Sequence, residues 1–120
     1  MYITKKFEFE AAHKLPDKEL YGKCRNLHGH TYKLEVTISG EVQADGMVIN
    51  FTDLKKAVKE NIIDICDHRY LNDVFPDVIT TAESLVHIFW TILSTKLPEA
   101  VELEKLVLYE TSNSFVTLKK

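Results

Sequence analysis

Three histidines in the first quarter of the chain are the residues best suited to hold a metal ion. His28 and His30 are separated by one residue, and such residues project from the same face of a β-strand. His13 has the parity of Phe7 and Phe9 in an earlier alternating segment, so it can join the pair if the two strands are neighbours. Three imidazoles without a fourth protein ligand are typical of catalytic zinc sites, which keep one position open. We therefore predict a Zn²⁺ site at these histidines.

Cys24, shortly before His28, leaves two interpretations open. As a fourth metal ligand it would close a structural Cys/His₃ site. Its basic neighbours Lys23 and Arg25 instead favour a thiolate, which can act as a base or nucleophile. The second cysteine, Cys66, falls on the apolar side of a predicted helix end, and we expect it to be an inert buried residue.

Two acidic positions add further chemistry. Asp67 and His68 place a carboxylate beside an imidazole, a combination that transfers protons in many enzymes. A solvated carboxylate and a histidine at a helix C-terminus would explain the same residues without catalysis. Glu110 ends an otherwise apolar strand, where it lies either at the rim of a sheet or against the N–H groups of a ligand. Local sequence alone favours the structural interpretation for both positions.

The elements that must position these residues follow from the hydrophobic periodicity. Alternation predicts strands, a three-to-four spacing after Asn50 predicts a helix, and the segment 80–83 has the spacing of a capping box. The predicted strands are 2–15, 28–39, 103–111 and 115–118, the predicted helices are 51–65 and 80–98, and 16–27 is a predicted loop. The order ββααββ predicts an α+β fold, a four-stranded antiparallel sheet with two helices on one face.

Length and charge narrow the class of protein. The chain has 120 residues, which fits a single domain over 1–120. The net charge of −3 argues against nucleic acid as a partner, because nucleic-acid binders usually carry a dominant basic surface. No apolar stretch of membrane-spanning length and no signal-peptide pattern are present, so we expect no membrane partner and a cytoplasmic protein. Residues 1–33 hold seven Lys or Arg against four Asp or Glu, which favours an anionic ligand there.

Six motifs together resemble the 6-pyruvoyltetrahydropterin synthase superfamily. They occur in the family's order along nearly the whole chain: Phe9-Glu10-Ala11-Ala12-His13, Cys24-x-x-x-His28-Gly29-His30, Asp67-His68, Leu71-Asn72, Thr81-Ala82-Glu83 and Tyr109-Glu110-Thr111. The resemblance implies the tunnelling fold (T-fold) and a homo-oligomer, a trimer or a dimer of trimers, with sites at subunit interfaces. Cys24 before His-Gly-His in so short a chain is most similar to the 6-carboxytetrahydropterin synthases of queuosine biosynthesis.

The resemblance also implies a role for each site residue. The three histidines would bind zinc, Cys24 would be the base, and Asp67 with His68 from a neighbouring subunit would complete a proton relay. Glu110 would hold the pyrimidine N–H groups of a pterin, assisted by Thr80 and Thr81. The substrate would be 7,8-dihydroneopterin triphosphate, and the local positive charge suggests the residues that contact its triphosphate: Lys14, Lys18, Lys23 and Arg25.

Three functions remain open at this point. The first is a carbon-carbon lyase that forms 6-carboxytetrahydropterin and releases acetaldehyde and triphosphate. The second is a pyruvoyl-type synthase, which eliminates triphosphate without cleaving a carbon-carbon bond. The third is a zinc-binding module without catalytic activity, in which Asp67, His68 and Glu110 need have no role.

Overall fold

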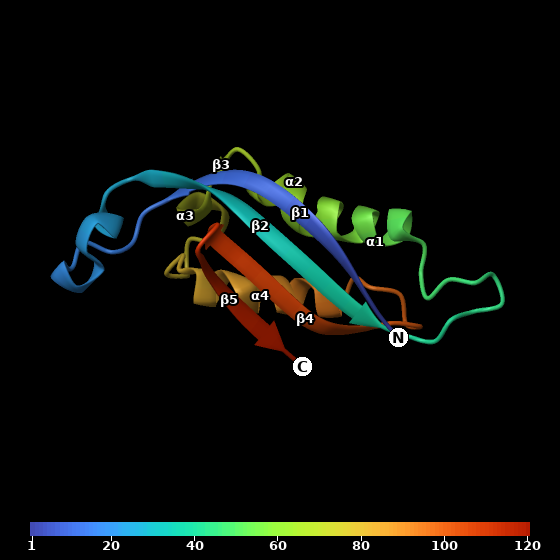
Figure 1. Cartoon of the computed structure of the whole chain (residues 1–120). Helices are drawn as coiled ribbons and strands as arrows, with labels where there is room; N and C mark the ends of the chain where they lie inside the picture. Colours follow the sequence, from blue (N-terminus) through green and yellow to red (C-terminus); the bar gives the residue numbers. More distant parts are fainter.

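A five-stranded sheet carries helices on one of its faces (Figure 1). The computed structural model describes all 120 residues. The sheet order is β3-β1-β2-β4-β5. Its strands are β1 (Tyr2–His13), β2 (His28–Ser39), β3 (Arg69–Tyr70), β4 (Glu102–Thr111) and β5 (Ser114–Lys119). The four long strands are antiparallel neighbours, as their alternating sequence predicted.

The sheet is mixed and has one strand more than predicted. β3 pairs in parallel with β1 through Ala11↔Arg69 and Ala12↔Tyr70. Two residues cannot show the alternation that identifies a strand, so the sequence pattern had no means of indicating β3. The prediction of a purely antiparallel four-stranded sheet was wrong in this respect.

The helical part is also more divided than predicted. Asn50 caps the first helix as expected, since its Oδ1 accepts a hydrogen bond from Thr52 N at 2.8 Å. The predicted helix 51–65 comprises α1 (Phe51–Val58), the π-helical η2 (Lys59–Ile63) and α2 (Asp64–Cys66), and it is followed by α3 (Leu71–Val74) and α4 (Ala82–Ser94). A short 3₁₀ helix, η1 (Glu19–Arg25), lies within the predicted loop. There are thus four α-helices rather than two.

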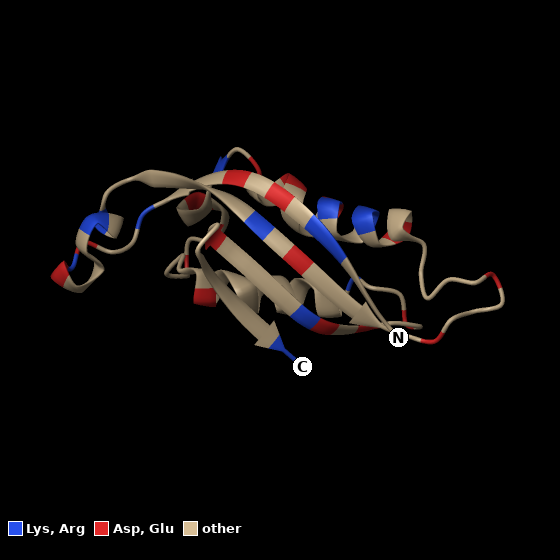
Figure 2. Cartoon of the chain, in the orientation of Figure 1, with Lys and Arg blue, Asp and Glu red and all other residues tan.

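The core lies between the sheet and the helices. Phe9 on β1 stacks on Tyr32 of β2 with ring centroids 4.9 Å apart, and Phe89 of α4 meets Phe9 edge-on. All three rings are buried, and burying such a side chain stabilises a fold by about 1.5–3 kcal/mol. The predicted strand parity is therefore confirmed. On the opposite face, acidic and basic positions are distributed along β1 and β2 (Figure 2).

Both edges of the sheet are largely open within one chain. β3 pairs only with Ala11 and Ala12, so β1 has no strand partner on that side over residues 2–9. β5 forms the other edge, and its Phe115 is 54% exposed. Unpaired edges are templates for pairing with another chain. None of the helices has the length and apolar character needed to cross a membrane.

Candidate active site

The end of β1 and the start of β2 bring the three predicted histidines together. His13 and His28 are directly opposite in the β1–β2 register, and Ala11 is opposite His30. The ring centroids lie 4.5 Å apart for His13 and His28, 5.0 Å for His28 and His30, and 5.3 Å for His13 and His30. The two strands are neighbours and the three rings share the core-facing side, as the parity predicted.

A carboxylate completes this cluster. Ligand atoms of His13, His28, His30 and Glu110 all lie within 4.8 Å of one another. Glu110 Oε1 is 2.9 Å from His30 Nε2 and 3.6 Å from His13 Nε2. The pairing of β4 with β5 shifts register between Tyr109 and Thr111, and such irregularities can re-aim a side chain beside a functional site.

Sequence reasoning did not place Glu110 with the histidines. Its parity with the buried Leu106 and Leu108 is the signal that could have done so. Cys24, in contrast, is not part of the cluster. The geometry therefore favours Glu110 over Cys24 as the fourth polar group around the imidazoles.

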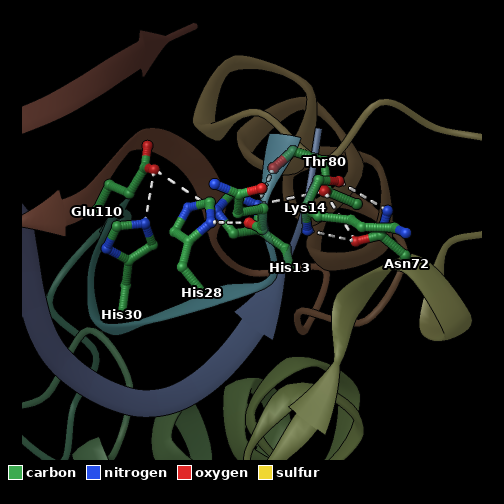
Figure 3. A network of polar contacts seen from close by, with 8 residues as sticks. His13, Lys14, His28, His30, Asn72, Thr80 and Glu110 are labelled. Carbon is green, nitrogen blue, oxygen red and sulfur yellow. Dashed lines mark hydrogen bonds and ion pairs between the residues drawn. The ribbon is translucent and has the colours of Figure 1, made fainter. Parts of the chain in front are cut away.

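The hydrogen bonds of two imidazoles define which ring nitrogen is free. His13 Nδ1 lies 2.8 Å from the Thr80 carbonyl oxygen, and His28 Nδ1 lies 2.7 Å from the Asn26 carbonyl oxygen (Figure 3). Because a carbonyl oxygen can only accept, Nδ1–H must be the donor in both rings. Each neutral ring then presents a bare lone pair on Nε2, the usual arrangement of a histidine that ligates a metal.

These free atoms fit a divalent cation. His13 Nε2 is buried without a hydrogen-bond partner, and the buried His30 Nε2 has only the Glu110 carboxylate beside it, at 2.9 Å. The lone pair of His13 faces the carboxylate of Glu110, so two acceptors point into the same small space. A cation between them would satisfy both, and nitrogen with oxygen donors in this number suits zinc.

Burial and neighbouring groups shift the pKa values of two side chains in the cluster, His30 and Glu110. Burial lowers the pKa of His30, although the nearby Glu110 carboxylate opposes the shift. When His13 and His30 are protonated, the hydrogen bond with His13 and the charge of His30 lower the pKa of Glu110 against the opposing effect of burial. A metal ion would displace those protons, since neutral imidazoles and an ionised carboxylate are the forms that bind metals.

Asp67 and His68 form a separate pair on the outer side of β1. His68 Nδ1 is 3.0 Å from Asp67 Oδ2. The Glu10 peptide holds them, because Glu10 N donates to Asp67 Oδ1 at 2.9 Å and His68 N donates to Glu10 O at 2.6 Å. His68 has a φ of +58°, a conformation that is uncommon for residues other than glycine and recurs at functional sites. Its side chain is 78% exposed, so the pair faces outward rather than into the cluster of its own chain.

The Asp67 contacts predict a pH-dependent contribution to stability. The Glu10 N–H, and then His68, lower the pKa of the Asp67 carboxyl. A depressed pKa contributes stability that is complete above the unfolded value of about 3.9 and is lost as pH falls through the folded value. We expect Asp67→Asn to lower the melting temperature at pH 6, and this difference from wild type to shrink below about pH 4. Asp73→Asn, at an exposed position of α3, is the control in the same thermal scans; a difference that grows at low pH would contradict the prediction.

The remaining predicted site residues lie close by but in different environments. Cys24 is half-buried in η1, and its carbonyl oxygen accepts from Leu15 N at 2.8 Å, which ties η1 to the residues after His13. Cys66 is buried as expected, and burial raises the pKa of its thiol to about 12.

The two threonines before α4 have different roles. The N-cap is Thr81, whose Oγ1 accepts from Ser84 N at 3.2 Å, so the helix start predicted by the capping-box spacing over 80–83 is present, with its cap at the second threonine. Thr80 is fully buried against His13. Thr80 therefore cannot contact a substrate directly in this conformation. Thr81 is only half-buried, so part of its surface is accessible.

A cleft of about 390 Å³ is lined by the residues that follow His13 and by the segment after α3. Its lining includes Lys14, Arg25 and Asn72. The Arg25 guanidinium is held by Gly22 O at 3.0 Å and lies 3.5 Å from Asp17. Lys18 and Lys23 are exposed nearby in the chain, on and beside η1. Four basic residues, Lys14, Lys18, Lys23 and Arg25, thus lie on or near the projecting η1 segment, while others lie on β1 and β2 (Figure 2).

Comparison with known proteins assigns this chain to one family. The family model for 6-pyruvoyl tetrahydropterin synthase matches residues 2–120. The chain belongs to this family of pterin synthase enzymes. The T-fold that the resemblance implied is therefore confirmed, with the five-stranded sheet described above.

Individual relatives carry two different names. The chain is 41% identical over 131 residues to the 6-pyruvoyl tetrahydrobiopterin synthase of Pongo abelii, covering 98% of this chain and 90% of that protein. It is 51% identical over 75 residues to the 6-carboxy-5,6,7,8-tetrahydropterin synthase of Haemophilus influenzae, covering 59% of this chain and 52% of that protein. Among solved structures, the 6-pyruvoyl tetrahydropterin synthase of Caenorhabditis elegans matches with a TM-score of 0.88 at 31% identity, over 100% of this chain and 95% of that one.

Proposed function

We propose that the protein is a zinc-dependent 6-carboxy-5,6,7,8-tetrahydropterin synthase. It would convert 7,8-dihydroneopterin triphosphate and one water molecule to 6-carboxytetrahydropterin, acetaldehyde and triphosphate. The observation that carries the proposal is the cluster of three imidazoles and Glu110 in a chain of the pterin synthase family. Support for the carboxy branch comes from Cys24, placed as in that branch, and from the local 51% identity to a carboxy synthase.

His13, His28 and His30 would hold the zinc ion, and zinc at this place supplies Lewis acidity toward substrate hydroxyl oxygens. The protein's part is to orient the rings. Two backbone carbonyls orient the His13 and His28 rings, and burial lowers the pKa of His30, which favours its neutral form.

Cys24 would take and return a proton of the substrate side chain, and Asp67 with His68 would handle the companion proton. An imidazole beside a carboxylate suits proton transfer near neutral pH. His68 is exposed at the outer side of β1. It would therefore act on a substrate bound at the histidine cluster of a neighbouring copy of the chain. This requires the homo-oligomer that the open edges of β1 and β5 favour, a trimer or a dimer of trimers with sites at the interfaces.

The Glu110 carboxylate would accept hydrogen bonds from the N–H groups of the pterin and so anchor it, and Thr81 would assist in this binding. A carboxylate accepts two such hydrogen bonds, whereas a carboxamide offers one acceptor and two donors. We expect Glu110→Gln to raise KM on the order of 10–100-fold, the usual cost of losing hydrogen bonds to a charged group.

Zinc content separates this role from that of a metal ligand. Glu110→Gln should retain one zinc per chain. The control is Glu83→Gln, in the exposed first turn of α4, which should have the zinc content and the KM of the wild type. Loss of zinc with an unchanged KM would assign Glu110 to the metal instead.

The basic residues around η1 would contact the triphosphate. Lys14 and Arg25 line the cleft next to His13, and Lys18 and Lys23 extend the positive charge. We expect Lys14→Ala and Arg25→Ala each to raise KM about tenfold, since each removes a charge-assisted contact. Lys96→Ala, beyond the far end of α4, is the control. An unchanged KM in steady-state kinetics would exclude this placement of the triphosphate.

Product analysis tests the proposed reaction directly. Purified, metal-analysed protein is incubated with 7,8-dihydroneopterin triphosphate, with Cys24→Ala as control. Acetaldehyde and 6-carboxytetrahydropterin, both absent in the control, are the expected products. A pyruvoyl product without acetaldehyde would move the protein to the branch named by its Pongo abelii relative. Zinc binding without turnover would instead support a non-catalytic zinc module.

A further inference from the structure

The side chain of Asn72 joins three segments that meet behind the histidine cluster. Asn72 is the second residue of the short helix α3. Its Nδ2 donates to the carbonyl oxygen of Lys14 at 2.8 Å, and its Oδ1 accepts from Lys14 N at 3.1 Å. One amide thus satisfies both backbone groups of the residue that directly follows His13, where β1 has ended (Figure 3).

The same amide oxygen reaches the segment before α4. Thr80 Oγ1 donates to Asn72 Oδ1 at 3.3 Å. Thr80 has no exposed surface, and both its carbonyl oxygen and its hydroxyl lie against His13 Nδ1, at 2.8 and 3.2 Å. A continuous chain of hydrogen bonds therefore runs from Asn72 through Thr80 to the imidazole of His13.

Since the Thr80 hydroxyl donates its hydrogen to Asn72 Oδ1, its oxygen can only accept a hydrogen bond from His13. The carbonyl oxygen of Thr80 can only accept as well. Both contacts therefore require hydrogen on Nδ1 of His13, which leaves Nε2 as the metal-binding atom. Asn72 also holds the backbone on the C-terminal side of His13, so it constrains the ring's position as well as its tautomer.

We propose that Asn72 is a positioning residue of the metal site: through Lys14 and Thr80 it fixes the position of His13 and reinforces the tautomer that the Thr80 carbonyl sets, and thereby raises zinc affinity. The inference rests on the proposed function, because it requires that the cluster binds zinc. Partners behind a metal-ligating histidine commonly change metal affinity by about 10–100-fold when removed, and we expect Asn72→Ala to weaken zinc binding within that range.

The test is zinc affinity of the full chain, measured by competition with a chromophoric chelator, with no substrate present. Asn50→Ala is the matched control, since it also removes a structural asparagine hydrogen bond, at the start of α1. Asn72→Asp keeps the acceptor for Lys14 N and Thr80 Oγ1 but sets a carboxylate oxygen against Lys14 O in place of the donor, so it should also weaken zinc binding. Thr80→Val interrupts the chain at its middle and should weaken zinc binding in the same direction.

Thr80→Val and Asn72→Ala should also be less than additive in the double variant, because they interrupt one chain of hydrogen bonds. The Co²⁺-substituted protein gives an independent readout, since a changed ligand arrangement alters its visible absorption spectrum. If Asn72→Ala does not fold, Thr80→Val and Asn72→Asp decide the question by the same affinity measurement. Wild-type zinc affinity in Asn72→Ala, or a loss equal to that of Asn50→Ala, would overturn the inference while leaving the proposed function intact. A wild-type protein that binds no zinc would overturn both.

Discussion

Replacing His28 with alanine is expected to remove zinc and to lower kcat by at least about a thousandfold, the scale associated with losing a principal source of electrostatic stabilisation. His28 presents a bare Nε2 to the cluster because Asn26 O accepts from its Nδ1. It is also only half-buried, unlike His13, which is 1% exposed. The substitution therefore tests the metal site with less disturbance of the core than one at His13.

The measurements are zinc per chain by elemental analysis and turnover of the pterin triphosphate. His87→Ala is the matched control, because His87 lies on the exposed side of α4 and should keep both zinc and activity. Melting temperatures of the metal-free proteins show whether His28→Ala still folds. A folded variant that retains one zinc and wild-type turnover would remove His28 from the proposed metal centre.

Strand parity was enough to predict the histidine trio, and the reason is physical. Residues two apart on a half-buried strand must share a face, so His13, His28 and His30 could be assigned to the core side once Phe9 and Tyr32 were recognised as core. The pairing of β1 with β2 then placed His13 opposite His28. The family resemblance supplied the fold and the roles that parity alone could not.

Other parts of the site depended on tertiary structure that no local pattern contains. Glu110 shares the parity of the buried Leu106 and Leu108, but its contact with the histidines depends on the pairing of β4 with β2, two segments far apart in the sequence. β3 and α3 are too short to show a period, yet α3 carries Asn72. Thr80 and Thr81 are adjacent and chemically identical, so only the observed packing decides which one caps α4 and which one contacts His13.

Mixing two inactive variants is expected to restore activity if Asp67 and His68 act on a neighbouring chain. Cys24→Ala and His68→Ala should each lower kcat by about 10²–10⁴-fold, the usual contribution of a general acid or base. In a mixed homo-oligomer some interfaces combine an intact Cys24 from one chain with an intact His68 from the next. With equal amounts and random assembly, about a quarter of the sites would be intact, because each site needs one particular variant on each side of the interface.

The two variants are co-expressed with different affinity tags and purified through both, so that every assembly contains both chains. Because this purification removes assemblies of a single variant, the expected activity is about a third of wild type for a trimer and about a quarter for a dimer of trimers, with almost none in either variant alone. A mixture of Cys24→Ala with Asp67→Asn should recover in the same way, since Asp67 and His68 lie on the same chain. A preparation of Cys24→Ala with His28→Ala should stay inactive, because Cys24 and His28 serve the same site from one chain. If the first mixture also stays inactive, the exposed Asp67–His68 pair has no catalytic role across the interface, and its contacts with Glu10 serve the fold alone.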